Sequence, residues 1–295
     1  MRLIVSSNCV TASLALAMEA LVPQSEVVAF SYHDLTEARR EHLVSLVRGA
    51  DVWIAGGLPE FRDDIMRAVD WPTVQLVTIP DMVFDAFHPD LVYGWLADGL
   101  PLQTLAGPYN SAIALWAMRH NLTAAETVRL FTPEIFDRLG YTRRWQPSIE
   151  RLNIDLGVHG FDYREYILPL RREGVFMHST NHPTIAAIAQ LGRMIARRLG
   201  VDEEVLAEPV ERTLVDVLKQ VSPVWPVYPS IANSLGVAGS FTWKAASGHS
   251  VRLDDYVAKS LEMFDSLGRP EFGCWELDEL PYDVVLGSAL AGAIR

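Results

Sequence analysis

Asn8 and Cys9 are the first residues whose types and position indicate chemistry. They follow Ser6 and Ser7 at the end of an apolar run, Leu3-Ile4-Val5, that predicts a buried strand, and a helix is expected directly after them. Backbone N–H groups at a helix N-terminus bind anions and favour a thiolate, so Cys9 is a candidate nucleophile with a lowered pKa. A small buried core cysteine is the alternative interpretation.

Two further polar motifs contain histidine. His88-Pro89-Asp90 follows the fourth expected strand, and Asp85 precedes His88 at a spacing that also occurs in the Asp-His pairs of some esterases. Residues 178–184 combine His178 and His182 with an amide and three hydroxyls, directly before a long amphipathic helix. Histidine is the side chain best suited to proton transfer near neutral pH. The alternatives are a turn stiffened by proline, with an acidic helix cap, for the first motif and a simple helix cap for the second.

Basic residues form a third group of candidates. Arg143-Arg144, Arg171-Arg172 and Lys244 would suit a phosphate-bearing ligand if they lie together, and solvated surface charge is the alternative. A zinc site is not expected, because the histidine spacing matches no common ligand pattern and Cys274 is distant in sequence.

Composition narrows the class of protein. The net charge of the 295-residue chain is −12, which argues against nucleic acid as a partner, and two cysteines do not imply a disulfide scaffold. The first 22 residues are interrupted by Ser6, Ser7, Asn8 and Glu19, so they predict a strand and a helix rather than a signal peptide. No window has the 18 apolar residues of a membrane span. We expect a cytoplasmic protein without an integral membrane segment.

The expected elements would bring these motifs to one edge of a sheet. Strands are predicted at 3–5, 26–30, 51–55 and 74–79, with helices at 10–22, 36–47 and 61–69 between them. This alternation predicts an α/β fold, with an N-terminal parallel sheet and flanking helices, flavodoxin-like or doubly wound. Ligands of such sheets bind at the carboxyl ends of the strands.

The rest of the chain is expected to be mostly helical. Helices are predicted at 109–120, 123–131, 133–139, 161–171 and 184–199, with Thr123 and Thr132 as N-caps and a short strand at 175–178. We therefore expect an α/β region over residues 1–105 and a mostly helical region over residues 106–295, packed together as one integrated domain.

The three motifs together resemble the WcbI-like family. An Asn-Cys pair after the first strand, a His-Pro-Asp after the fourth, and an Asn-His-Pro before a long helix occur in that order in the family. The stretch Val227-Tyr228-Pro229 and the segment from Leu235 to Lys244 are also similar to its ending. The resemblance covers roughly residues 2–265. This chain has Ser7-Asn8-Cys9-Val10 where the family pattern reads Gly-Asn-Cys-Gln.

The resemblance implies transfer of an acyl group, acetyl, from coenzyme A to a sugar hydroxyl in capsular polysaccharide biosynthesis. The general base would be His182, or His88 if His182 is distant. Asn8 and a backbone N–H near Cys9 would stabilise the oxyanion, and direct transfer is favoured over a covalent relay through Cys9. Coenzyme A or acetyl-CoA would bind at Ser7, Asn8, Cys9, Asn181, Arg143, Arg144 and Lys244.

Two other functions stay open. A hydrolase related to the SGNH esterases would use Ser6 or Ser7 with an Asp-His pair and would cleave esters without coenzyme A. A binding protein of a glycan pathway would retain the pocket without turnover, and the substitutions at Ser7 and Val10 are compatible with a different acceptor or with lost activity.

Overall fold

The computed structural model describes residues 1–32, 36–57, 59–69 and 73–293. The chain divides into two compact units that interleave in sequence. Unit 1 comprises Met1–Val83, Glu150–Met177 and Asn181–Leu218, and unit 2 comprises Phe84–Ile149, His178–Thr180 and Lys219–Arg295. The division expected at residue 105 and the single integrated domain stay predictions.

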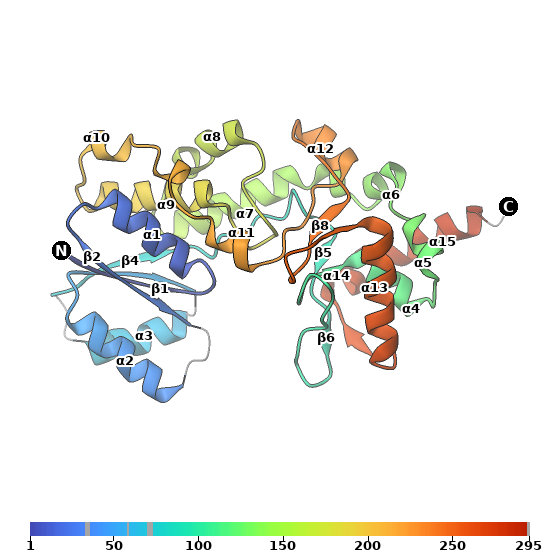
Figure 1. The fold of residues 1–295 in the computed structure, drawn as a ribbon, viewed down its shortest axis with the longest axis horizontal. Helices are drawn as coiled ribbons and strands as arrows, with labels where there is room; N and C mark the ends of the chain where they lie inside the picture. The colour runs from blue at the N-terminus through green and yellow to red at the C-terminus, as the bar shows by residue number, and fades with distance from the viewer. Residues whose placement is uncertain (33–35, 58, 70–72, 294–295) are drawn as a thin grey trace. The chain divides into compact units, whose positions relative to one another are not determined.

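Unit 1 is built on a four-stranded parallel sheet of order β2-β1-β3-β4, which confirms the expected α/β fold. Helix α1 lies on one face of this sheet and α2 and α3 lie on the other (Figure 1). Because both faces are covered, β1 and β3 consist almost entirely of buried residues. The bounds are β1 Arg2–Ser7, α1 Thr11–Leu21, β2 Glu26–Ser31, α2 Glu37–Arg48, β3 Val52–Gly56, α3 Pro59–Ala68 and β4 Gln75–Ile79.

The strand order creates a switch point between β1 and β3. The chain leaves β1 toward β2 on one side and returns to β3 on the other, and ligands of such sheets are expected at the carboxyl ends of these strands. The end of β3 is closely packed, because a Cβ on Gly56 would lie 2.6 Å from Ser7 Oγ and 2.8 Å from Ile79 Cγ1. Only glycine fits at this strand end without displacing its neighbours.

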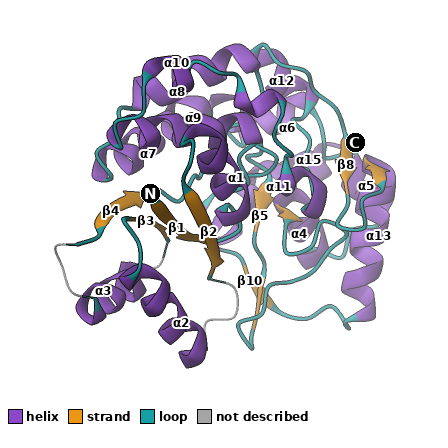
Figure 2. Cartoon of the chain, turned by 60° about the vertical axis from the view of Figure 1, so that its left-hand side comes forward, coloured by secondary structure: helices purple, strands orange, loops and turns teal. Residues whose placement is uncertain are grey.

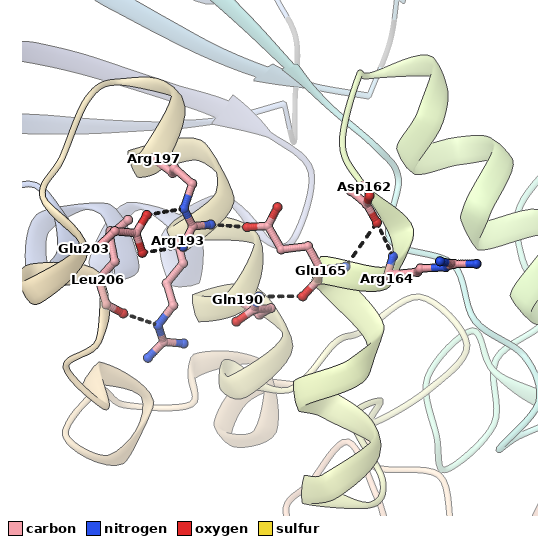
Figure 3. A network of polar contacts seen from close by, with 8 residues as sticks. All are labelled: Asp162, Arg164, Glu165, Gln190, Arg193, Arg197, Glu203 and Leu206. Atoms are coloured by element: carbon pink, nitrogen blue, oxygen red, sulfur yellow. Dashed lines mark hydrogen bonds and ion pairs between the residues drawn. The ribbon is translucent and has the colours of Figure 1, made fainter.

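Further helices complete unit 1. Helix α9 packs against α1 and α8, and α10 packs against α9. Figure 3 shows polar contacts that connect these helices: Gln190 Nε2 donates to the Glu165 carbonyl at 2.9 Å, and Arg197 pairs with Glu165 and Glu203. Thr184 is the N-cap of α9, as one interpretation of the sequence expected, since its side chain accepts from Ala187 N. The bounds are α7 Trp145–Val158 (which begins in unit 2), α8 Tyr163–Glu173, α9 Ile185–Arg198, α10 Glu203–Leu206 and η2 Val210–Arg212.

Unit 2 is mostly helical, as expected for the C-terminal half, and helices dominate the chain beyond the parallel sheet (Figure 2). Thr123 and Thr132 are N-caps as predicted, and Thr123 forms a capping box with Glu126. The helices are α4 Ala112–Arg119, α5 Ala124–Val128, α6 Pro133–Arg138, η1 Tyr141–Arg143, α11 Val217–Val221 (which begins in unit 1), α12 Pro229–Leu235, α13 Leu253–Ser266, α14 Trp275–Glu279 and α15 Tyr282–Ala293.

Three two-stranded antiparallel sheets join these helices in unit 2. They pair β5 with β7, β6 with β10, and β8 with β9. The bounds are β5 Leu91–Val92, β6 Trp95–Leu96, β7 Asn110–Ser111, β8 Thr242–Lys244, β9 Ser250–Arg252 and β10 Phe272–Gly273.

One predicted element is wrong. Residues 175–178 do not form a strand, because Met177 makes only an isolated bridge to Pro183. Phe176 and Met177 are apolar because they are buried in a loop, and burial alone does not distinguish a strand from a buried loop. Among the helices of the described ranges, none is long and apolar enough to cross a membrane.

Candidate active site

Asn8 and Cys9 occupy the turn between β1 and α1. Asn8 Oδ1 accepts from Val10 N at 3.3 Å and from the Cys9 thiol at 3.7 Å, and the Asn8 carbonyl accepts from Thr11 Oγ1 at 2.7 Å. These bonds fix the orientation of the amide. Within the described part of the chain, Asn8 Nδ2 donates to no acceptor. Its N–H groups can therefore donate to a ligand oxygen.

Asn8 and Asn181 line one pocket in unit 1. The pocket has a volume of about 210 Å³, and its wall also contains Val10 and the segment 80–83 that follows β4. It therefore lies at the carboxyl end of the sheet, where the strand order places a ligand. Sites for drug-sized ligands usually exceed about 300 Å³, so this pocket suits the reactive end of a large ligand rather than the whole molecule.

The expected thiolate at Cys9 is not what the structure shows. Burial raises the pKa of the half-buried Cys9 thiol, and the Asp81 carboxylate raises it further, while the backbone N–H groups of Cys9 and Val10 oppose the shift only in part. Desolvation thus outweighs the helix N-terminus, and the thiol is protonated at neutral pH.

Asp81 and His159 are two titratable residues that the sequence did not indicate. Asp81 lines the pocket directly after β4. His159 follows α7, and its Nδ1 is buried with no hydrogen-bond partner among the described residues. Burial lowers the pKa of His159, an effect that Arg62 increases and Asp81 opposes. His159 is therefore a neutral imidazole within electrostatic reach of the pocket carboxylate.

His182 is next in sequence to the pocket residue Asn181 and is itself buried. The Met177–Pro183 bridge and the bond from Thr184 N to the Phe176 carbonyl hold this segment at the start of α9. The assignment of His182 as the base stays a prediction.

Of the remaining candidates, Arg171 and Arg172 lie in the last turn of α8 in unit 1, and the others belong to unit 2. His88 is buried there, and the Asp85 carboxylate accepts from Arg144 Nε at 2.9 Å and from Ser148 Oγ. Arg143 pairs with Asp137 at 2.9 Å. Lys244 Nζ donates to the carbonyls of Gln220 and Ser222. The three cations thus already have protein partners, and their role toward phosphates stays a prediction.

Asp90 forms hydrogen bonds to several segments in the core of unit 2. Its carboxylate is fully buried and accepts from Tyr228 Oη at 2.6 Å, Tyr141 Oη at 2.9 Å and Ile113 N at 3.1 Å. Burial raises the pKa of Asp90 to about 6, although these donors pull it down. The third residue of the His-Pro-Asp motif therefore has a structural role. Its bond from Ile113 N lies in the first turn of α4, but the N-cap of that helix is Ser111, so Asp90 is not the cap that the alternative interpretation expected.

No group of residues in the described ranges could hold a metal ion. A doubly wound parallel sheet with a thiol and two amides at its carboxyl edge is an arrangement typical of α/β enzymes. Residues 2–204 match the family model described as polysaccharide biosynthesis enzyme WcbI. Because this match spans well over half of the chain, the chain belongs to the WcbI family.

A solved structure of WcbI has the same fold. It matches 100% of this chain and 99% of its own, with a TM-score of 0.76 and 14% sequence identity. It is described as a novel polysaccharide biosynthesis enzyme, in a native form without the disulfide bond between coenzyme A and one of its cysteines. No curated protein matches this chain in sequence.

Proposed function

We propose that this chain transfers an acyl group, acetyl, from coenzyme A to a carbohydrate hydroxyl. The pocket shared by Asn8 and Asn181 beside Cys9 carries the proposal. Membership of a family of polysaccharide biosynthesis enzymes supports the carbohydrate, and the mention of coenzyme A in the description of a solved relative supports the donor. The pocket volume of about 210 Å³ suits the acyl thioester end of such a donor.

In this reaction the acceptor hydroxyl attacks the thioester carbonyl. His182 takes the hydroxyl proton, and Asn8 Nδ2 donates to the developing oxyanion together with a backbone N–H near Cys9. Cleavage of the C–S bond releases the coenzyme thiolate, which recovers a proton from the imidazolium. The products are an O-acylated sugar and free coenzyme A, and His182 is neutral again.

Direct transfer is favoured over a relay through Cys9. The relay needs a thiolate to attack the thioester, and burial together with Asp81 raises the pKa of this thiol. Cys9 then lies between the pocket residues Asn8 and Val10 without forming a bond to the acyl group. Its thiol donates to Asn8 Oδ1, a contact that orients the amide for the oxyanion.

The coenzyme phosphates are proposed to bind near the N-terminus of α1 or at Arg143, Arg144 and Lys244. Arg143 is the most available of the three cations, because 65% of its side chain is exposed. Arg143→Ala should weaken coenzyme A binding and reduce the salt dependence of the affinity. An unchanged salt dependence would show that Arg143 does not bind the phosphates.

Coenzyme A binding is the first test. At a concentration of about 100 Kd a ligand adds about 2.7 kcal/mol to the free energy of unfolding, which a thermal shift detects. Asn8→Ala should weaken binding, and Asn153→Ala, which removes an exposed amide on α7, should not. No heat and no thermal shift at millimolar coenzyme A would refute the donor.

Turnover is the second test. With an acyl donor and a competent acceptor, His182→Ala should lose about 10²–10⁴-fold in rate, the scale of a general base. His178→Ala, which removes the other buried histidine of the same segment, is the matched control. Cys9→Ala should keep most of the activity. Complete loss in Cys9→Ala, with a wild-type mass increase of one acyl group, would establish the relay instead.

The serine hydrolase alternative has less support. Ser6 is fully buried, and its Oγ accepts from Trp53 Nε1 at 2.7 Å and bonds Tyr32 Oη at 2.9 Å. Ser7 is buried against Gly56. Neither hydroxyl is exposed to a substrate. Coenzyme A binding without acyl transfer to any acceptor would favour the non-catalytic binding protein.

A further inference from the structure

Unit 2 contains a second hollow, which the acyl-transfer proposal does not use. It has a volume of about 460 Å³, within the usual range of small-ligand sites. Its wall comes from the end of α4, the segment after α13, β10 and α14. The polar and aromatic residues of the wall are Arg119, Asn121, Arg269, Glu271, Phe272 and Asp278.

Side-chain contacts connect these segments into a fixed wall. Arg119 Nη1 donates to Asp278 Oδ1 at 2.8 Å, and Arg119 Nη2 donates to the Phe272 carbonyl at 3.1 Å. The same guanidinium lies 4.8 Å from the centre of the Phe272 ring. A second pair of lining residues is also connected, because Arg269 Nη1 donates to Asn121 Oδ1 at 2.6 Å. A ligand would therefore meet polar groups that are already oriented, which reduces the entropic cost of binding.

The charges of the wall select the class of ligand. The wall contains two arginines and two carboxylates, Glu271 and Asp278, so its formal charge is zero. Asn121 and Arg269 follow the C-terminal ends of α4 and α13, where the helix dipole is negative and disfavours an anion. A phosphate would also have to compete with the carboxylate already paired to Arg119.

What remains favourable is a neutral ligand with many hydroxyl groups. Carboxylates and the Asn121 amide accept from hydroxyls, guanidinium groups donate to them, and Phe272 adds an apolar ring surface for C–H groups. We propose that this hollow binds a neutral sugar residue of the carbohydrate acceptor, a substrate assignment that rests on the proposed acyl transfer.

Saturation-transfer NMR on the full chain without coenzyme A tests this site. The probes are D-glucose, D-galactose, D-mannose and N-acetyl-D-glucosamine, with glucose 6-phosphate as the anionic comparison. At least one neutral sugar should bind, and glucose 6-phosphate should bind no tighter than glucose. Absence of binding by all four neutral sugars, or tighter binding of the phosphate, would overturn the proposal.

Two variants locate the binding. Asp278→Ala should weaken the affinity for the bound sugar at least 10-fold, whereas Glu262→Ala, which removes an exposed carboxylate of α13 outside the hollow, should change it less than twofold. Arg269→Gln is a second variant in case Asp278→Ala does not fold. Unchanged affinity in the folded hollow variants would overturn the assignment. Loss of coenzyme A binding with sugar binding intact would refute only the proposed donor, and the reverse result would refute only this site.

Discussion

The hydroxyl of Tyr228 should contribute more to the stability of the protein than any lone buried hydroxyl, because it donates to a buried carboxylate. Tyr228 Oη lies 2.6 Å from Asp90 Oδ2, and both residues are buried. A hydrogen bond to a charged group contributes about 1.5–3 kcal/mol, against about 0.5–1.5 kcal/mol for a neutral pair. Tyr228→Phe should therefore lower the free energy of unfolding by about 2–3 kcal/mol at pH 7.5.

The effect should decrease in acid. The pKa of Asp90 is raised from 3.8 to about 6 in the folded protein, so the carboxyl is mostly protonated at pH 5. A raised acid pKa means that the native state holds the proton more tightly, so this group favours folding below pH 4 and loses that contribution as the pH rises to 6. The whole change is about 3 kcal/mol. At pH 5 Tyr228→Phe should cost only about 1 kcal/mol, because the bond is then between neutral groups.

Urea unfolding followed by tryptophan fluorescence measures both values, with m compared between variants. Tyr166→Phe is the matched control, because the buried Tyr166 hydroxyl has no hydrogen-bond partner in the described part of the chain. Its removal should be neutral or stabilising. The reasoning is wrong if Tyr228→Phe costs no more than Tyr166→Phe at pH 7.5, or if it costs more at pH 5.

Three further predictions follow from local geometry. Gly56→Ala should lower the free energy of unfolding by about 1–3 kcal/mol, measured with urea, because its Cβ would meet Ser7 and Ile79. Gly157→Ala in α7 has open space for the Cβ and should be neutral or stabilise by up to about 1 kcal/mol. Equal effects of the two substitutions would contradict the close packing around Gly56. The rate at which iodoacetamide alkylates Cys9 should have a pH midpoint above the usual thiol pKa of about 8.5, as peptide mass spectrometry would measure. Asp81→Asn should lower that midpoint. A midpoint below about 8.5 would show that Cys9 is a thiolate of lowered pKa. Thr123→Ala should cost about 1 kcal/mol by removing a capping box, and no measurable change in melting temperature would show that the box is redundant.

Hydrophobic runs and turn residues predicted the parallel sheet and the helices α1 to α6, α8 and α9, because those signals are local, but for the chain after Gly200 they indicated only a mostly helical region without bounds for α13 or α15. They did not predict the helix Trp145–Val158, because Pro147 usually indicates the end of a helix. Pro147 lies in the first turn of this helix, where proline is tolerated. The strand order β2-β1-β3-β4 was also not predictable from sequence periodicity, because pairing between strands depends on tertiary packing.

The site was predictable only where polar residues form a motif. Asn8 and Asn181, which line the pocket, drew attention because they flank regular elements, whereas Asp81 is a single acidic residue after a proline and gives no signal. The raised pKa of Cys9 depends on burial, which the helix N-terminus alone did not reveal. The partner of Asp90 at Tyr228 is 138 residues away, so no local pattern connects them.

The interleaving of the two units has a consequence for synthesis on the ribosome. Strands β1 to β4 are complete at Ile79, but α9, which packs against α1, ends at Arg198. At about 5–20 residues per second, the completed sheet and its helix α1 lack this cover for about 6–24 s. During that interval its apolar residues are open to chaperones and to other nascent chains. A truncation after Val83 would make this exposure permanent, so the sheet region should not be expected to remain dispersed as an isolated fragment.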